Sequence, residues 1–318
     1  SHEVAQGYKE VKERSAVVRF KIKGEEGYFL AWTTTPWTLP SNVALCVHPD
    51  LEYAKVKAAD GNLYILAVAR LDAVLSGLAK EGEEAYSILE TCKGKDLVGL
   101  SYEPLYDGAE KEAERQHKKA HIVVSDYYVS ADDGTGIVHI APAFGEDDGR
   151  IGRENDLALV KFVDSEGKLT AETPFFGMRC KPTEKEVAEG AISADPEVLK
   201  DLEKRGLLFD APKFEHSYPH CWRCGTPLIY YARESWFIKM TAVRDELVAN
   251  NNTVNWIPES IGKGRFGDWI ENVQDWSLSR DRYWGTPLNI WECKDCGEQE
   301  AIGSIKELSE RADNYQEV

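Results

Sequence analysis

The distribution of apolar residues in the first part of the chain predicts strands before helices. Ala16–Ile22 alternates apolar and polar positions, Tyr28–Trp32 is a short apolar run, and Leu63–Val68 follows a turn signal at residues 60–62. A helix is then expected over Val68–Lys80, where four apolar residues would share one face. The pattern therefore predicts a part of the fold that is rich in strands and has a helix attached.

Short helices are expected to close this first part. Thr183-Glu-Lys-Glu186 has the spacing of a capping box, and Asp195-Pro196 supplies a helix cap and a first-turn proline, with Gly206 as the stop. The order of strands and helices lacks the regular alternation of a doubly wound sheet. We therefore expect an α+β fold.

The composition changes near residue 211. Seven of the nine tryptophans follow this point, and proline and glycine become frequent. A chain of 318 residues is long enough for about two domains. We predict one domain over residues 1–210 and a smaller, irregular module over residues 211–318, with helices at about Ala242–Asn250 and Ser304–Ala312.

The charge disfavours one broad class of function. The chain has 38 Lys+Arg and 55 Asp+Glu, which gives a formal net charge of −17. Because nucleic-acid binding relies on a basic surface, a free-standing nucleic-acid binder is disfavoured. The apolar runs are far shorter than the roughly 20 residues of a membrane span, and no targeting segment is evident. We expect a cytoplasmic protein with no membrane contact.

The seven cysteines separate into single residues and pairs. Three stand alone, as small buried residues commonly do: Cys46, Cys92 and Cys180. Four form two Cys-x-x-Cys pairs: Cys221/Cys224 and Cys293/Cys296. An odd count without a secretion signal disfavours disulfides, and four thiolates would complete a tetrahedral structural zinc site. His216 and His220 are substitute ligands, and two unlinked reduced pairs are the alternative.

The string from Trp32 to Asn42, Trp-Thr-Thr-Thr-Pro-Trp-Thr-Leu-Pro-Ser-Asn, is the most unusual in the chain. Thr33, Thr34 and Thr35 would close a strand with hydroxyls on alternate faces, and the following proline forces a turn. Hydroxyl groups would then gather at one strand end. The alternative interpretation is structural, because threonine is a favoured strand residue.

A second candidate runs from Gly134 to Asp148, Gly-Thr-Gly-Ile-Val-His-Ile-Ala-Pro-Ala-Phe-Gly-Glu-Asp-Asp. Its strand-like part carries His139, and the Asp148 carboxylate follows nine residues later. This unit could supply an imidazole and a carboxylate to one site. The alternatives are a histidine satisfied within the core and an acidic first turn of a helix.

Together these strings resemble the editing (CP1) domain of the isoleucyl-tRNA synthetases, a family of class I aminoacyl-tRNA synthetases. Two further motifs extend the likeness to nearly the whole chain: His216-Ser-Tyr-Pro-His-Cys-Trp-Arg223 and Trp276-Ser-Leu-Ser-Arg-Asp-Arg-Tyr-Trp-Gly285. The valyl and leucyl families typically have Thr-Thr-Arg-Pro and then an acidic residue, where this chain has Thr35-Pro36-Trp37. The resemblance implies a β-barrel-like editing core with a smaller zinc-bearing connective module.

The resemblance also implies hydrolysis of valine from mischarged Val-tRNA(Ile), with valyl-adenylate as a second substrate. An apolar pocket discriminates isoleucine from valine by only about 150-fold, a figure already known for this enzyme family. By the family's pattern, Asp148 would hold the substrate ammonium, and His139 would crowd the side-chain pocket. The threonines Thr33, Thr34 and Thr35 would position the terminal adenosine and water with Asn42, and Trp32 would wall the site.

The sequence contains neither His-x-Gly-His nor Lys-Met-Ser-Lys-Ser, the two signatures with which class I synthetases bind ATP. The resemblance therefore implies that ATP serves only the full-length enzyme. We expect a monomeric piece that receives the tRNA(Ile) 3′ end, rejects valine and works with the rest of the synthetase. Two alternatives stay open: an editing domain of a valyl or leucyl synthetase, and a non-catalytic zinc-stapled module that contacts tRNA.

Overall fold

The computed structural model describes residues 6–79, 82, 84–279 and 288–313. The chain forms two compact units, Ser1–Ala232 and Arg233–Val318. The division falls later than the boundary expected at 210/211. The reason is that β11 (Lys213–Pro219) pairs antiparallel with β1 (Tyr8–Arg14) along its whole length, which attaches this segment to the first unit.

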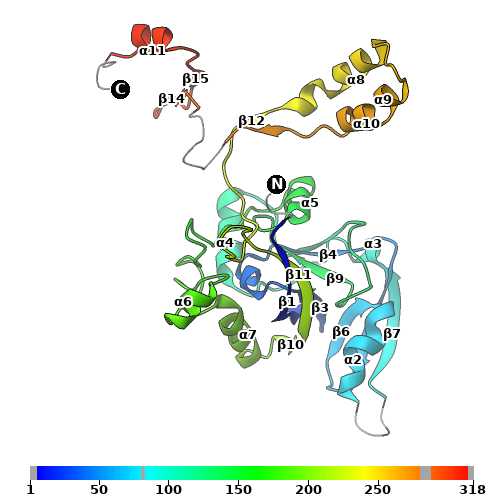
Figure 1. Ribbon diagram of the computed structural model, residues 1–318. Helices are drawn as coiled ribbons and strands as arrows, with labels where there is room; N and C mark the ends of the chain where they lie inside the picture. Colours follow the sequence, from blue (N-terminus) through cyan, green and yellow to red (C-terminus); the bar gives the residue numbers. More distant parts are fainter. Residues whose placement is uncertain (1–5, 80–81, 83, 280–287, 314–318) are drawn as a thin grey trace. The chain divides into compact units, whose positions relative to one another are not determined.

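The first unit is built around a nine-stranded mixed sheet, which is curled into a half barrel (Figure 1). Seven strands follow the order β7-β5-β6-β3-β9-β4-β8, and β2 and β10 continue from the other edge of β3. The strands are β2 (Ala16–Lys21), β3 (Tyr28–Thr33), β4 (Ala44–Val47), β5 (Glu52–Ala58), β6 (Leu63–Ala67), β7 (Tyr86–Lys93), β8 (Ile122–Ser125), β9 (Ile137–Ile140) and β10 (Leu208–Asp210). The expected α+β class is confirmed, and the expected strands correspond to β2, β3, β6 and β9.

The sheet forks at β3. Along one edge, β3 pairs antiparallel with the whole of β2. Along the other edge, Tyr28 and Phe29 pair with β6, whereas Trp32 pairs with Val138 of β9. This change of partner places the threonine-rich end of β3 beside the strand that carries His139.

The helices of the first unit are short: α2 (Leu71–Leu75), α3 (Gly94–Leu97), α4 (Asp107–Gln116), α5 (Glu146–Glu154), α6 (Glu184–Ala188), α7 (Ala194–Lys204) and the 3-10 helices η1 (Pro36–Ser41), η2 (Val68–Arg70) and η3 (Ser76–Leu78). The helix expected over residues 68–80 is split into η2, α2 and η3, none of which has a side-chain cap, and Lys80 lies outside the described residues. The capping box of Thr183 and Glu186 is formed as predicted.

The second unit consists of small hairpins and helices. Ribbon β12 (Phe237–Ile238) and β13 (Trp276–Ser277) encloses η4 (Met240–Val243), α8 (Arg244–Thr253), α9 (Ser260–Lys263) and α10 (Arg265–Glu271). Hairpin β14 (Ile290–Glu292) and β15 (Gln299–Ala301) is followed by α11 (Ile305–Arg311), so the two helices expected here, α8 and α11, are confirmed. Residues 280–285 of the motif from Trp276 to Gly285 lie outside the described residues.

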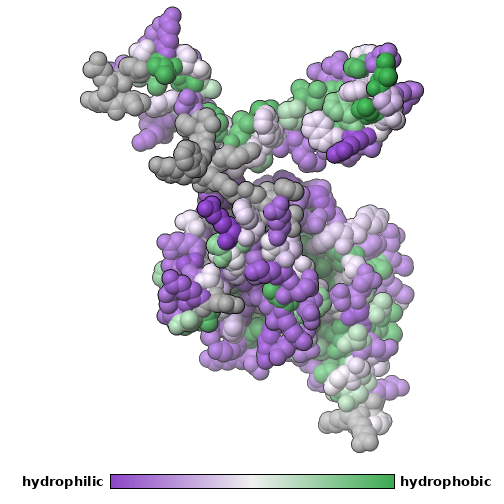
Figure 2. All heavy atoms as spheres, viewed as in Figure 1, coloured by the Kyte–Doolittle hydropathy of each residue, from purple (hydrophilic) through white to green (hydrophobic). Residues whose placement is uncertain are grey.

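Apolar side chains are prominent on the surface of the second unit. Figure 2 shows hydrophobic residues near the β12–β13 ribbon, in which Phe237 is 55% exposed. The aromatic residue Trp276 in the same ribbon is 57% exposed. Within the part of the chain that the structure describes, no helix is long and apolar enough to cross a membrane.

Candidate active site

The threonine-rich string forms a tight turn between β3 and η1. Thr33 is the last residue of β3 and is buried, and Thr35 directly precedes η1. The Thr35 N–H donates to Thr33 Oγ1 at 3.1 Å, and the two hydroxyl oxygens lie 3.4 Å apart. Thr34 lies between them and is half-buried. Two of the three predicted hydroxyls are thus held together at the strand end.

Thr38, in the middle of η1, connects this turn to His139. Its hydroxyl donates to the Thr35 carbonyl oxygen at 2.8 Å and lies 2.8 Å from His139 Nε2. Because the hydroxyl hydrogen is committed to Thr35, Nε2 of His139 carries the ring hydrogen and donates it to Thr38. Sequence analysis did not include Thr38 among the site residues. Its place in the same string, one 3-10 turn after Thr35, is the signal that could have found it.

Asn42 contacts the other ring nitrogen of His139. Its Nδ2 donates to the Ala44 carbonyl oxygen at 2.9 Å and lies 3.4 Å from His139 Nδ1. Its Oδ1 accepts a hydrogen bond of 2.6 Å from the Tyr102 hydroxyl. These contacts fix the amide so that Nδ1 of His139 is an acceptor, which agrees with a hydrogen on Nε2. Tyr102 was missed because no motif surrounds it.

The environment of His139 keeps its ring neutral. The residue is 6% exposed, and burial lowers its pKa to about 4. Both ring nitrogens are occupied by Thr38 and Asn42. A neutral, fully engaged imidazole is suited to shaping a pocket and is unsuited to carrying protons between water and substrate.

Asp148 lies in the first turn of α5, and its carboxylate is tied to the segment that follows His139. Oδ1 accepts a hydrogen bond of 2.9 Å from the N–H of Ala141, two residues beyond His139. Oδ2 faces Gly145, where any Cβ would collide with it. Burial raises the pKa of Asp148 to about 6, and the bond from Ala141 opposes this shift. The carboxylate is therefore ionised at neutral pH and can bind an ammonium group.

Trp32 lies on β3 next to Thr33, so strand geometry directs its side chain to the opposite face. Its indole is half-buried and stacks edge-on with Phe214, with 5.0 Å between ring centroids. Gly134 has a φ of +62°, and a Cβ there would collide with the Trp32 ring. Trp32 thus packs the string that begins at Trp32 against the string that begins at Gly134. Its role as a wall of the site stays a prediction.

Taken together, the structure brings Thr33, Thr35, Asn42 and His139 into one hydrogen-bond network through Thr38. The Asp148 carboxylate is bound to the backbone two residues beyond this network. Hydroxyls and an amide of this kind can orient a water molecule, and the carboxylate can hold a cation. Thr34 and Trp32 are neighbours of the network along the strand.

The two Cys-x-x-Cys pairs form hairpins of the same shape. In each, the N–H of the first cysteine donates over 2.8 Å to the carbonyl oxygen five residues later. The glycine after each pair has a positive φ, +73° at Gly225 and +72° at Gly297. Thr226 lowers the pKa of Cys224 to about 7, and the N–H of Cys296 lowers the pKa of Cys293. Such thiols suit zinc, which binds the thiolate form.

The predicted zinc site would draw its four cysteines from both units, which the structure describes separately. Among the described residues, no group of three or more His, Cys, Asp and Glu side chains is placed to hold a metal ion. Cys221/Cys224 belongs to the first unit and Cys293/Cys296 to the second. Of the suggested substitutes, His220 has Nδ1 2.9 Å from the Tyr218 carbonyl oxygen, whereas His216 Nε2 is buried without a hydrogen-bond partner among the described residues and lies 3.6 Å from Glu13 Oε2. Zinc therefore stays a prediction.

Comparison with known proteins shows the family to which the chain belongs. The family model of the class I tRNA synthetases (I, L, M and V) matches residues 3–317. The chain belongs to this family. The isoleucine–tRNA ligase of Clostridium novyi (strain NT) is 52% identical over 316 residues, which are 99% of this chain and 28% of that protein. The isoleucine–tRNA ligase of Clostridium acetobutylicum is 50% identical over 319 residues, 100% of this chain and 28% of the relative.

This class I synthetase chain thus spans little more than a quarter of the relatives that it matches. The resemblance to isoleucyl-tRNA synthetases is confirmed by relatives that match nearly its full length. Among solved structures, the editing domain of the P. knowlesi cytosolic leucyl-tRNA synthetase is similar, with 14% identity and a TM-score of 0.44. The match covers 66% of this chain and 99% of that one.

Proposed function

We propose that the first unit is the editing domain of an isoleucyl-tRNA synthetase and hydrolyses Val-tRNA(Ile), with valyl-adenylate as a second substrate. The observation that carries the proposal is the buried network from Thr33 through Thr38 to His139 and Asn42, together with the Asp148 carboxylate, which is bonded to the backbone two residues beyond His139. A hydrolase with no attacking side chain needs such an arrangement, because its rate comes from positioning.

Recognition of valine would divide between two groups. The Asp148 carboxylate would bind the α-ammonium of the aminoacyl group by a charge-assisted hydrogen bond. The neutral ring of His139, held at both nitrogens, would limit the depth of the side-chain pocket so that valine enters and isoleucine does not. A ring without a net charge is suited to this role, since it would face an apolar side chain.

Hydrolysis would use water that the threonine hydroxyls orient, while Asn42, whose amide contacts Ala44, Tyr102 and His139, would hold the histidine ring in place. The water oxygen attacks the ester carbonyl carbon, the bond between that carbon and the ribose oxygen breaks, and the ribose oxygen takes up a proton. The products are valine and tRNA(Ile). The neighbouring ribose hydroxyl of the adenosine would assist the proton transfer, because His139 has no nitrogen available for it.

A deacylation assay with three substrates, Val-tRNA(Ile), Ile-tRNA(Ile) and Thr-tRNA(Val), tests the proposal. Hydrolysis of Val-tRNA(Ile) alone supports it, whereas turnover of Thr-tRNA(Val) alone would identify a valyl editing domain. Asp148→Ala is expected to abolish the reaction, and His139→Ala is expected to begin hydrolysing Ile-tRNA(Ile). Near-full activity of Asp148→Ala would remove the ammonium anchor from the proposal.

The second candidate is a non-catalytic module of the synthetase that contacts tRNA. It is favoured by the complete satisfaction of His139, which is also what a structural core histidine shows. In that case the wild-type protein hydrolyses none of the three aminoacyl-tRNAs. The assay therefore separates the two candidates directly.

We further propose that each Cys-x-x-Cys hairpin supplies two thiolates to a structural zinc ion. Cys224→Ser and Cys293→Ser should each lower the zinc content measured by atomic emission, whereas Cys92→Ser, a single cysteine, should leave it unchanged. Undiminished zinc in Cys293→Ser would exclude the second hairpin as a ligand. The metal would stabilise the fold and would take no part in hydrolysis.

The net charge of the chain and the exposed aromatic residues of the second unit suggest how it would work with tRNA and with the rest of the synthetase. A net charge of −17 leaves little attraction for tRNA, so the rest of the synthetase would hold most of it and deliver the 3′ end. The exposed aromatic residues of the second unit would pack against that remaining part. The working form would then be one monomeric cytoplasmic enzyme, in which ATP serves the synthetic reaction alone.

A further inference from the structure

We infer that Asp195 is a positioning residue for the threonine-rich loop and that its carboxylate, anchored by Lys181, holds the first turn of η1 in place. The inference rests on the proposed editing function and names a residue in a distant helix that the reaction would require. Asp195 does not touch the aminoacyl group in this scheme. It acts through Trp37 and Thr38.

The first turn of η1 is capped from outside its own segment. The helix follows Thr35, whose side chain makes no capping hydrogen bond. Instead, the N–H of Trp37 donates over 2.8 Å to Asp195 Oδ1, a residue 158 positions away. A carboxylate at the start of a helix satisfies an otherwise unpaired N–H and interacts well with the positive end of the helix.

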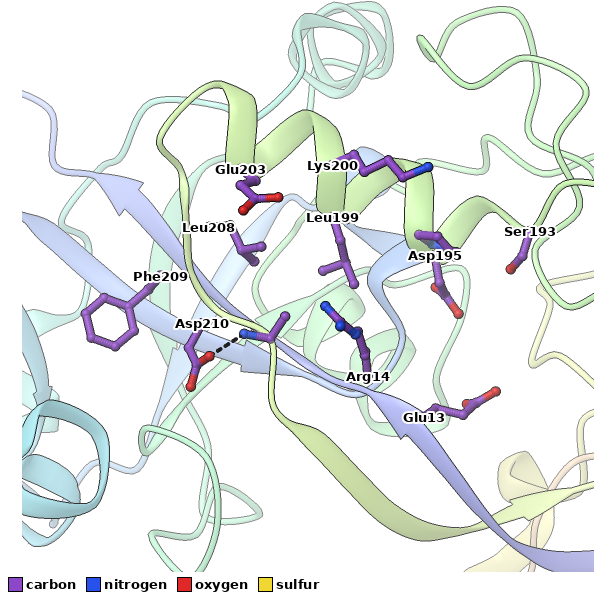
Figure 3. Close-up of a pocket in the computed structure, with 12 residues that line it drawn as sticks. Glu13, Arg14, Ser193, Asp195, Leu199, Lys200, Glu203, Leu208, Phe209 and Asp210 are labelled. Atoms are coloured by element: carbon purple, nitrogen blue, oxygen red, sulfur yellow. Dashed lines mark hydrogen bonds between the residues drawn. The ribbon is translucent and has the colours of Figure 1, made fainter. Parts of the chain in front are cut away.

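Asp195 binds Trp37 and does not cap α7, which corrects the helix cap expected from the sequence. The cap position of α7 is Ser193, and Asp195 lies within the first turn. Its side chain is 15% exposed and lines a cavity, in which it points toward the side where Glu13 lies (Figure 3). The cavity has a volume of about 770 Å³ and is lined by α7, β1 and the β10 segment.

Lys181 fixes the orientation of the Asp195 carboxylate. Its Nζ lies 2.9 Å from Asp195 Oδ2 and 2.7 Å from Glu13 Oε2, and it sits 5.2 Å from the centre of the Tyr218 ring. The lysine side chain is only 6% exposed. Since one carboxylate oxygen is held by Lys181, the other is directed at the Trp37 N–H.

The next residue of η1 carries this constraint to the site. Thr38 follows Trp37, its N–H donates to the Thr35 carbonyl oxygen at 3.0 Å, and its hydroxyl holds His139. If the Trp37 amide loses its acceptor, the turn can shift and Thr38 moves relative to His139. A small displacement of positioning groups is sufficient to slow a reaction that depends on orientation.

The test compares three variants of the full chain. Asp195→Ala removes the acceptor, and Asp195→Asn keeps an oxygen that can accept from Trp37 but loses the charge. Glu13→Gln is the matched control, because it weakens the far side of the Lys181 bridge and leaves the Trp37 bond intact. Amide exchange of Trp37 and Thr38, kcat and KM for Val-tRNA(Ile), and thermal unfolding are measured for each.

For Asp195→Ala we expect exchange of the Trp37 amide to become about tenfold faster or more and kcat to fall about tenfold, with KM within about twofold. Asp195→Asn should recover only part of both losses, because its amide nitrogen would face the Lys181 ammonium when its oxygen accepts from Trp37, and Glu13→Gln should resemble the wild type. Wild-type exchange in Asp195→Ala, or equal losses in the Ala and Asn variants, would overturn the inference. If the wild type itself hydrolyses nothing, the proposed function fails, while the exchange data still decide whether Asp195 holds the loop.

Discussion

The Tyr102 hydroxyl donates a hydrogen bond of 2.6 Å to Asn42 Oδ1 at a point where both residues are buried. This contact determines which way the Asn42 amide faces and, through it, which nitrogen of His139 carries the hydrogen. The threonine string, the strand histidine and the Tyr102 segment are therefore parts of a single polar network within an apolar core. In such a network, each member depends on its neighbours.

Tyr102→Phe should destabilise the protein although it removes only one atom. The buried Asn42 oxygen would lose its partner, which costs about 1–3 kcal/mol of unfolding free energy. Urea denaturation followed by fluorescence measures the change. Tyr86→Phe is the control, since its hydroxyl binds Asp72 at the surface, and the expected change is within about 0.5 kcal/mol. Equal changes in unfolding free energy for the two variants would show that the buried hydrogen bond stabilises the fold no more than the exposed one.

Asp148→Asn should make the protein more stable at pH 7 while it abolishes deacylation. The pKa of Asp148 is about 6 in the folded chain and about 3.9 when unfolded, so the folded state binds the proton more tightly. Ionisation therefore lowers stability as the pH rises from about 4 to about 6. Asparagine keeps an acceptor for Ala141 and avoids this cost. Melting temperatures at pH 7 and pH 4 should show the gain only at pH 7, and a gain of the same size at both values would contradict the assignment.

Gly145→Ala should disable the site by displacing Asp148. The added Cβ would collide with Asp148 Oδ2, whereas the backbone of Gly145, with a φ of −155°, accepts alanine without strain. Deacylation should fall about tenfold or more, mainly through weaker binding of the aminoacyl group. Gly77→Ala is the control, because a Cβ there meets nothing within 4 Å. Unchanged KM and kcat in Gly145→Ala would mean that the carboxylate position does not matter.

The ring of His139 should remain neutral well below the usual range for histidine. Its pKa of about 4 lies below the value of about 6.5 in the unfolded chain, so its contribution to stability is complete above pH 6.5 and is lost as the pH falls through about 4. Proton NMR should show a ring signal, identified by its loss in His139→Gln, that does not titrate between pH 8 and pH 5. A midpoint near 6.5 would show an exposed ring.

Local sequence predicted much of the fold and only part of the network. The strands, the capping box at Thr183 and the grouping of hydroxyls after β3 follow from short-range patterns. The contribution of Tyr102 could not be predicted in this way, because a single tyrosine near a turn has no distinguishing spacing. The Trp37–Asp195 contact was also hidden, since Asp195-Pro196 is fully explained locally as the start of a helix. The fork at β3 depends on which strands meet in space, and periodicity does not specify this.

The fork at β3 determines how the polar network of the candidate site forms during folding. β3 meets β9 at the single pair Trp32↔Val138, and a slip of one residue there would turn His139 to the other face of the sheet. A short peptide that carries the threonine string cannot reproduce the arrangement, because its partners come from strands far away in the chain. The proposed hydrolysis by this unit would thus require β3, β4 and β9 to be paired, and the activity would report complete folding more strictly than secondary structure does.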